Sequence, residues 1–215
     1  MPKISKKSKL QAITKMLQHA YPAPHCELKY SAPHELLIAT RLSAQCTDKR
    51  VNAISPELFA AFPNIQKFAT ANISNIERII KPCGLYKTKA ADIKGMCIAL
   101  IERHNETIPD NMESLLQLPG VGRKTANLIL GELYGHPAVV ADTHVIRLSN
   151  RLGLVSSKNA YKVETALRRQ IPAAESLAFC HRLVRHGREV CKARTPNCGE
   201  CILKEVCPIT ATIQS

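Results

Sequence analysis

Four cysteines crowd into a short segment near the C-terminus, and no other feature constrains the fold as strongly. Cys191, Cys198, Cys201 and Cys207 follow the spacing C-x6-C-x2-C-x5-C. Four thiolates this close in sequence can surround a single metal centre. Zinc sites usually contain two short cysteine pairs, whereas this segment has one, and an all-cysteine iron–sulfur cluster is chemically just as natural. The spacing therefore leaves zinc and iron–sulfur open, with coincidental core cysteines as a third alternative.

The other five cysteines lie among apolar residues and are expected to be small buried side chains. They are Cys26, Cys46, Cys83, Cys97 and Cys180. The N-terminal segment has lysines but no apolar stretch before a small-residue cleavage site, so we expect no secretory signal. No run approaches roughly eighteen consecutive apolar residues, so we also expect no membrane span. A cytoplasmic location, at the nucleoid if the chain is bacterial, is therefore predicted, and disulfides are rare in such a reducing compartment.

The chain carries 30 Lys and Arg residues against 17 Asp and Glu residues, a formal net charge of +13. Such an excess favours a polyanionic partner, above all nucleic acid, although a basic protein without such a partner could have the same composition. Between Thr143 and Gln170, Glu164 is the only acidic residue among several basic ones. Arg147 and Arg151 are four residues apart and would share a helix face. We expect this segment to face a polyanion, a solvated helix face being the alternative.

Apolar residues recur at helical spacing in most of the chain, as in HELLIATRLSAQ and NISNIERII, and strict alternation is missing. This pattern predicts an all-α fold. The residues that suit helix N-caps are Asn72, Ser74, Asp110 and Asn111. The glycines that suit helix ends or turns are Gly84, Gly131 and Gly135.

The stretch LPGVGRKTAN, from Leu118 to Asn127, carries the most chemical information. One helix would end at Pro119, Gly120 and Gly122 permit a tight turn, and a second helix would begin near Arg123. Unpaired amides at the start of that second helix form an anion site for a nucleic-acid phosphate. The stretch therefore predicts a helix–hairpin–helix element, with a plain glycine-rich turn as the alternative.

Lys124 would lie in the first turn of the second helix, where the helix dipole disfavours a cation and favours the nucleophilic neutral amine. Asp142 follows in the segment VADTHVIRLSN, just before another helical pattern. A phosphate-binding lysine and a helix N-cap carboxylate are the alternative interpretations of the two residues. An amine and a carboxylate near DNA would suit attack on a sugar carbon with departure of a base.

Taken together, these residues resemble those of the endonuclease III family of DNA glycosylases. LPGVGRKTAN is similar to the family's helix–hairpin–helix, which makes Lys124 the catalytic lysine. ADTHVIRLSNRLGL is similar to its aspartate motif, which makes Asp142 the catalytic carboxylate. The cysteine spacing is that of its [4Fe-4S] loop, and LSAQCTDKRVN and GLYKTKA resemble two further signatures. The similarity extends from about Glu35 to Cys207.

The resemblance implies two helical domains on either side of a DNA-binding cleft. Residues 26–136 would form a six-helix barrel that contains the helix–hairpin–helix. Residues 1–25 and 137–215 would form a discontinuous helical domain, whose loop at residues 191–207 carries the [4Fe-4S] cluster. The family also leads us to expect a monomer.

The resemblance further implies which residues contact DNA. Gln45 would fill the space that a flipped-out nucleotide leaves, and Leu85 would wedge into the opposite strand; their alternatives are a polar residue at a helix end and a core leucine. The other implied contacts are Gly120, Val121, Gly122, Arg123, Thr125, Lys192 and Arg194.

The implied activity is base-excision repair by a bifunctional DNA N-glycosylase. It would remove oxidised pyrimidines from double-stranded DNA and nick the strand at abasic sites by β-elimination. One alternative is the monofunctional adenine mismatch glycosylase of the same superfamily, which lacks a lysine at the position of Lys124. The other is a non-catalytic, zinc-containing DNA-binding protein.

Overall fold

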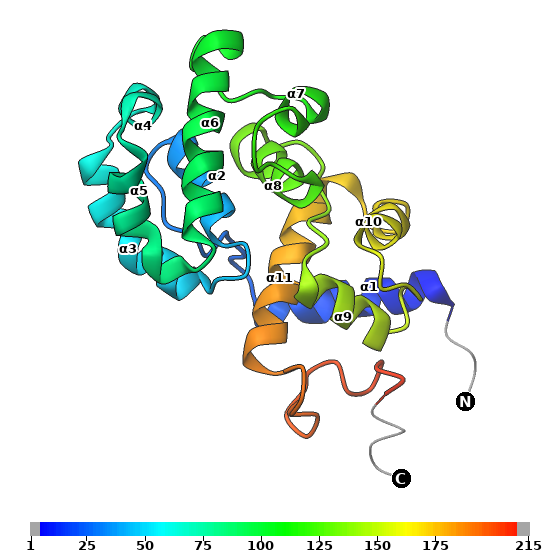
Figure 1. The fold of residues 1–215 in the computed structure, drawn as a ribbon. Helices are drawn as coiled ribbons and strands as arrows, with labels where there is room; N and C mark the ends of the chain where they lie inside the picture. The colour runs from blue at the N-terminus through cyan, green and yellow to red at the C-terminus, as the bar shows by residue number, and fades with distance from the viewer. Residues whose placement is uncertain (1–4, 210–215) are drawn as a thin grey trace. The chain divides into compact units, whose positions relative to one another are not determined.

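The computed structural model describes residues 5–209, and every regular element within them is a helix. The all-α prediction is confirmed. No helix in this part of the chain is both long and apolar enough to cross a membrane. The chain divides into two compact units, of which one is Cys26–His136 and the other combines the segments before and after it. Each unit is described by itself below (Figure 1).

The unit Cys26–His136 is built around a single apolar core. Its elements are α2 (Pro33–Leu42), α3 (Asp48–Ala61), α4 (Ile65–Thr70), α5 (Ile73–Ile80), η1 (Lys81–Cys83), α6 (Tyr86–His104), α7 (Met112–Leu116) and α8 (Arg123–Tyr134). The long helix α6 packs against α4 and α5, and α8 packs against α2 and α7 (Figure 1). Leu36, Phe68, Ile93 and Ile129 are fully buried between these helices. The core therefore fixes the short turns that connect the helices.

Side chains and glycines at the helix ends explain where several helices begin and stop. Asn72 caps α5 through the amide of Ser74, and Asn111 caps α7 through the amide of Ser114, so these two predicted N-caps are confirmed. The other two candidates are not caps, because Ser74 lies inside α5 and Asp110 precedes the cap of α7. Gly135 ends α8 in the left-handed region, at φ 67°. Gly131 does not end a helix: it is buried inside α8, whose next residues still pack against the core, so that expectation is wrong.

The other unit contains α1 (Lys6–Ala20), α9 (Thr143–Arg151), α10 (Ala160–Arg168), η2 (Ala173–Glu175) and α11 (Ser176–Glu189). Helix α11 packs against both α1 and α9. Gly187 permits the close approach to α9, because a Cβ there would lie 2.8 Å from Nδ1 of His144. After α11 the chain continues without a helix through the four-cysteine loop, residues 191–207.

Three of the five cysteines outside this loop are buried as expected: Cys83, Cys97 and Cys180. Cys26 and Cys46 are only half-buried, so the expectation is wrong for these two. Both lie at the edge of the core, next to turns, where a small apolar side chain is partly covered.

Candidate active site and iron–sulfur loop

Helices α7 and α8 are joined by the predicted hairpin. The amide of Val121 donates to the carbonyl of Leu118 at 3.1 Å and closes the turn. The side chains of Leu118 and Val121 are buried and anchor the hairpin in the core. Val121, an expected DNA contact, can therefore reach DNA only through its backbone.

Gly120 occupies a position that other residues cannot adopt without strain. Its φ is +73°, in the left-handed region. A Cβ at this position would lie 2.7 Å from Nε of Arg41 and 2.8 Å from Cβ of Asp92. Arg41 and Asp92 form an ion pair of 2.6 Å in which both side chains are mostly buried. The hairpin backbone thus rests directly on this pair.

The start of α8 presents backbone amides and an exposed lysine side by side. Gly122 is the N-cap and makes no side-chain cap. Arg123 and Lys124 are exposed in the first turn, and Thr125 is half-buried. Amides at a helix N-terminus attract anions, so this turn can hold a phosphate next to the amine of Lys124.

Asp142 lies in the other unit and begins α9. Its Oδ1 accepts a hydrogen bond from the amide of Val145 at 2.7 Å, so it is a helix N-cap. The side chain is half-buried. The cap uses Oδ1 and fixes the orientation of the carboxylate, while Oδ2 takes no part in it. The N-cap and a catalytic role are therefore compatible in this residue.

Gln45 and Leu85 share an unusual backbone conformation. Their φ angles are 54° and 48°, in the left-handed region that costs a non-glycine residue about 1–2 kcal/mol. Both side chains are exposed, and Leu85 retains 55% of its accessible surface. Leu85 is therefore not a core leucine. Strained backbone of this kind is characteristic of functional sites, where the surrounding structure holds it in place.

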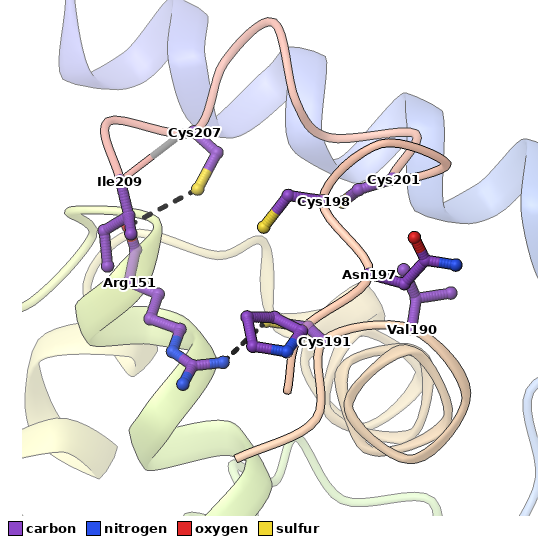
Figure 2. A pocket seen from close by; sticks show the side chains of 9 residues that line it. Arg151, Val190, Cys191, Asn197, Cys198, Cys201, Cys207 and Ile209 are labelled. Atoms are coloured by element: carbon purple, nitrogen blue, oxygen red, sulfur yellow. Dashed lines mark hydrogen bonds between the residues drawn. The ribbon is translucent and has the colours of Figure 1, made fainter. Parts of the chain in front are cut away.

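The four cysteines of the C-terminal loop line one pocket of about 70 Å³. Figure 2 shows the sulfurs of Cys198 and Cys207 directed into it. Burial raises the pKa of the Cys201 thiol, and the neighbouring Cys191, Cys207 and Cys198 raise it further. Thiolates gathered in this way repel one another and are stable together only around positive charge.

The spacing of these thiols distinguishes between the two metal centres left open by the sequence. A tetrahedral zinc site brings its sulfurs to within about 3.8 Å of one another, given Zn–S bonds of about 2.3 Å. Among residues 5–209, no three His, Cys, Asp or Glu side chains are placed to hold a single metal ion. A [4Fe-4S] cluster binds each cysteine to a different iron and needs wider spacing. Four thiols that line one pocket, without a position where three of them could hold a single ion, suit the cluster.

Two arginines predicted to face a polyanion bind the cysteine loop instead. Arg147 donates to the carbonyls of Gly187 and Cys191, both at 3.0 Å. Arg151 donates to the Cys191 sulfur at 3.2 Å and to the carbonyls of residues 192 and 193 at 2.8 and 2.7 Å. The prediction was wrong for these two residues, because carbonyls about forty residues away in sequence meet their side chains. Lys192 and Arg194 remain exposed on the loop.

His186 also belongs to this site, although no sequence pattern predicts it. It is buried, its Nε2 lies 3.4 Å from the Cys201 sulfur, and its Nδ1 lies 3.1 Å from the Tyr21 hydroxyl. Burial lowers its pKa, which favours the neutral ring. Partners of this kind orient the ligands of a metal centre. The only sequence signal for this role is its position in the last turn of α11, shortly before Cys191.

Comparisons with known proteins agree with this geometry. Residues 38–173 match the HhH-GPD superfamily of base excision DNA repair proteins, and residues 191–207 match the iron-sulfur binding domain of endonuclease III. Endonuclease III of Synechocystis sp. is 43% identical over 95% of this chain and 94% of its own length. Endonuclease III of Escherichia coli is 38% identical over 95% and 96%.

Solved structures give the same result. A trapped endonuclease III–DNA covalent intermediate is similar to this chain with a TM-score of 0.94 and 36% identity, covering 99% of this chain and 100% of that one. A thermostable thymine-DNA glycosylase, at 21% identity and a TM-score of 0.84, shares the fold. The chain therefore belongs to the endonuclease III family, and it is a bifunctional DNA glycosylase and AP lyase of base excision repair with a [4Fe-4S] cluster.

Proposed function

We propose that Lys124 is the nucleophile and Asp142 the assisting carboxylate, and that the substrates are oxidised pyrimidines and abasic sites in double-stranded DNA. The observation that carries the proposal is the start of α8, where an exposed amine lies beside amides suited to a phosphate. The similar endonuclease III that was trapped as a covalent DNA intermediate supports a mechanism in which the protein bonds covalently to the DNA.

In this mechanism the neutral Nζ of Lys124 attacks C1′ of the flipped nucleotide, and the bond to the oxidised base breaks. Asp142 accepts a proton from the attacking amine or stabilises the positive charge that develops on the sugar. The C1′–O4′ bond of the sugar then breaks, O4′ takes up a proton, and the protonated Schiff base that forms between C1′ and Nζ acidifies the proton at C2′. Loss of that proton expels the 3′ phosphate by β-elimination, which nicks the strand. The step requires Lys124 and Asp142 to act on the same nucleotide.

The remaining predicted contacts position the DNA. The backbone at Gly120, Val121 and Gly122 and the first turn at Arg123 and Thr125 would hold phosphates of the damaged strand. Gln45 and Leu85 are exposed, as residues that enter the duplex must be. Lys192 and Arg194 would add backbone contacts from the cysteine loop.

The [4Fe-4S] cluster, when bound, holds the four cysteines together and so fixes the loop that carries Lys192 and Arg194. Arg151 and His186 orient the sulfurs of Cys191 and Cys201. No step of base excision uses an electron. A monomeric state and a cytoplasmic, nucleoid-associated location remain predictions.

The test is borohydride trapping on a duplex that contains an oxidised thymine. The wild type should give a covalent protein–DNA adduct, and Lys124→Ala should give none while remaining folded. Lys162→Ala is the matched control, because Lys162 is also an exposed lysine in the first turn of a helix, α10. It should trap as the wild type does. An undiminished adduct in Lys124→Ala would show that another amine is the nucleophile.

A further inference from the structure

A buried lysine connects the two turns that carry Gln45 and Leu85. Lys89 lies on α6 and is fully buried. Its Nζ donates to the carbonyl of Leu42 at 2.8 Å and to the carbonyl of Cys83 at 2.9 Å. Leu42 is the last residue of α2, three residues before Gln45, and Cys83 ends η1, two residues before Leu85. One ammonium group thus joins the two turns.

The chemistry of this contact suits a cation. The last carbonyls of a helix lack intrahelical partners and carry partial negative charge, so a lysine can satisfy them. Burial lowers the pKa of Lys89, whereas the thiols of Cys46 and Cys83 raise it. A buried lysine is costly to the fold unless it is paired, and here the carbonyls of Leu42 and Cys83 pair it.

The two turns need external support. Gln45 and Leu85 hold left-handed backbone conformations that neither residue type favours. The connection by Lys89 is reinforced by Arg50 of α3, whose guanidinium donates to the carbonyl of Pro82 at 3.2 Å. Such contacts hold the backbone against relaxation into ordinary conformations.

We propose that Lys89 is a positioning residue that fixes the spacing between the Gln45 turn and the Leu85 turn, so that both side chains enter the duplex at the same nucleotide. This inference rests on the proposed function, in which Gln45 and Leu85 penetrate the DNA. Lys89 itself touches no substrate. Its loss should impair flipping of the damaged nucleotide and leave the chemistry at Lys124 unchanged.

The test compares duplex and single-stranded substrates, because a single strand needs no flipping from a stack. In Lys89→Met, single-turnover base excision from a lesion duplex should fall roughly 10- to 100-fold, the loss typical of a misplaced substrate group. Borohydride trapping on a single-stranded abasic oligonucleotide should stay within about twofold of the wild type. Lys94→Met is the matched control. Lys94, on the same helix, donates to the carbonyl of Ala71 at 2.7 Å, away from both turns, and its loss should leave both rates unchanged.

If Lys89→Met does not fold, Lys89→Gln is used in its place, because glutamine keeps a hydrogen-bond donor. Its rate of base excision from the lesion duplex should lie between those of the wild type and Lys89→Met. Equal losses on duplex and single strand would mean that Lys89 is merely structural and would overturn the inference. Gln45→Ala and Leu85→Ala are measured in parallel. If Gln45→Ala and Leu85→Ala leave base excision from the duplex unchanged, the proposed function of the two turns is wrong. If these two variants reduce duplex excision but Lys89→Met and Lys89→Gln do not, only the positioning role of Lys89 is wrong.

Discussion

Replacing Gly120 with alanine should destabilise the hairpin in two separable ways. The left-handed φ of +73° costs an alanine about 1–2 kcal/mol. The new Cβ would also lie 2.7–2.8 Å from atoms of Arg41 and Asp92, and overpacking of this kind costs about 1–3 kcal/mol. The Arg41 side chain cannot yield freely, because it is bonded to Asp92, whose Cβ is fixed to α6. We therefore expect Gly120→Ala to lower the free energy of unfolding by about 2–5 kcal/mol.

Two other glycines supply the controls. Gly135 also has a positive φ, 67°, but a Cβ there would meet nothing within 4 Å, so Gly135→Ala should cost only the backbone strain of about 1–2 kcal/mol. Gly122 has a φ of −99° and open space, so Gly122→Ala should affect stability least. Unfolding in urea, monitored by circular dichroism, gives the free energy of unfolding of each of the three variants. Equal losses in Gly120→Ala and Gly135→Ala would refute the close approach to Arg41 and Asp92.

Three further predictions concern Asp142, Arg151 and the pH dependence of stability. Asp142→Asn should keep the cap to Val145 and lose base excision, whereas Asp142→Ala should also lose about 1 kcal/mol of stability, as urea unfolding would show. Arg151→Gln should release the cluster faster under a chelator, seen as loss of visible absorption, because the Cys191 sulfur loses its donor. Burial lowers the pKa of His34, so the unfolded chain binds more protons and stability should fall as pH drops below about 6.5. His34→Gln should reduce this dependence, which urea unfolding at pH values above and below about 6.5 would measure.

The features that the sequence predicted well depend on neighbouring residues. The hairpin follows from glycines next to a helix start, and the caps at Asn72 and Asn111 use amides two and three residues away. The four cysteines that the spacing predicts as ligands line one pocket, but the spacing alone leaves zinc and the cluster open.

The features that escaped prediction depend on contacts between distant residues. Arg41 and Asp92, which support Gly120, are 51 positions apart. Lys89 reaches a carbonyl 47 positions away, and Arg151 reaches one 41 positions away. Spacing along the chain shows that Arg147 and Arg151 share a helix face, but only the packing of α9 against α11 determines that this face meets the cysteine loop.

In the proposed mechanism, every later step depends on a covalent bond between Lys124 and the sugar. Its most direct test is to reduce the intermediate with borohydride, digest the protein, and locate the DNA-derived mass among the peptides by tandem mass spectrometry. We expect the added mass on Nζ of Lys124. An added mass on any other amine, with Lys124 unmodified, would show that Lys124 is not the nucleophile.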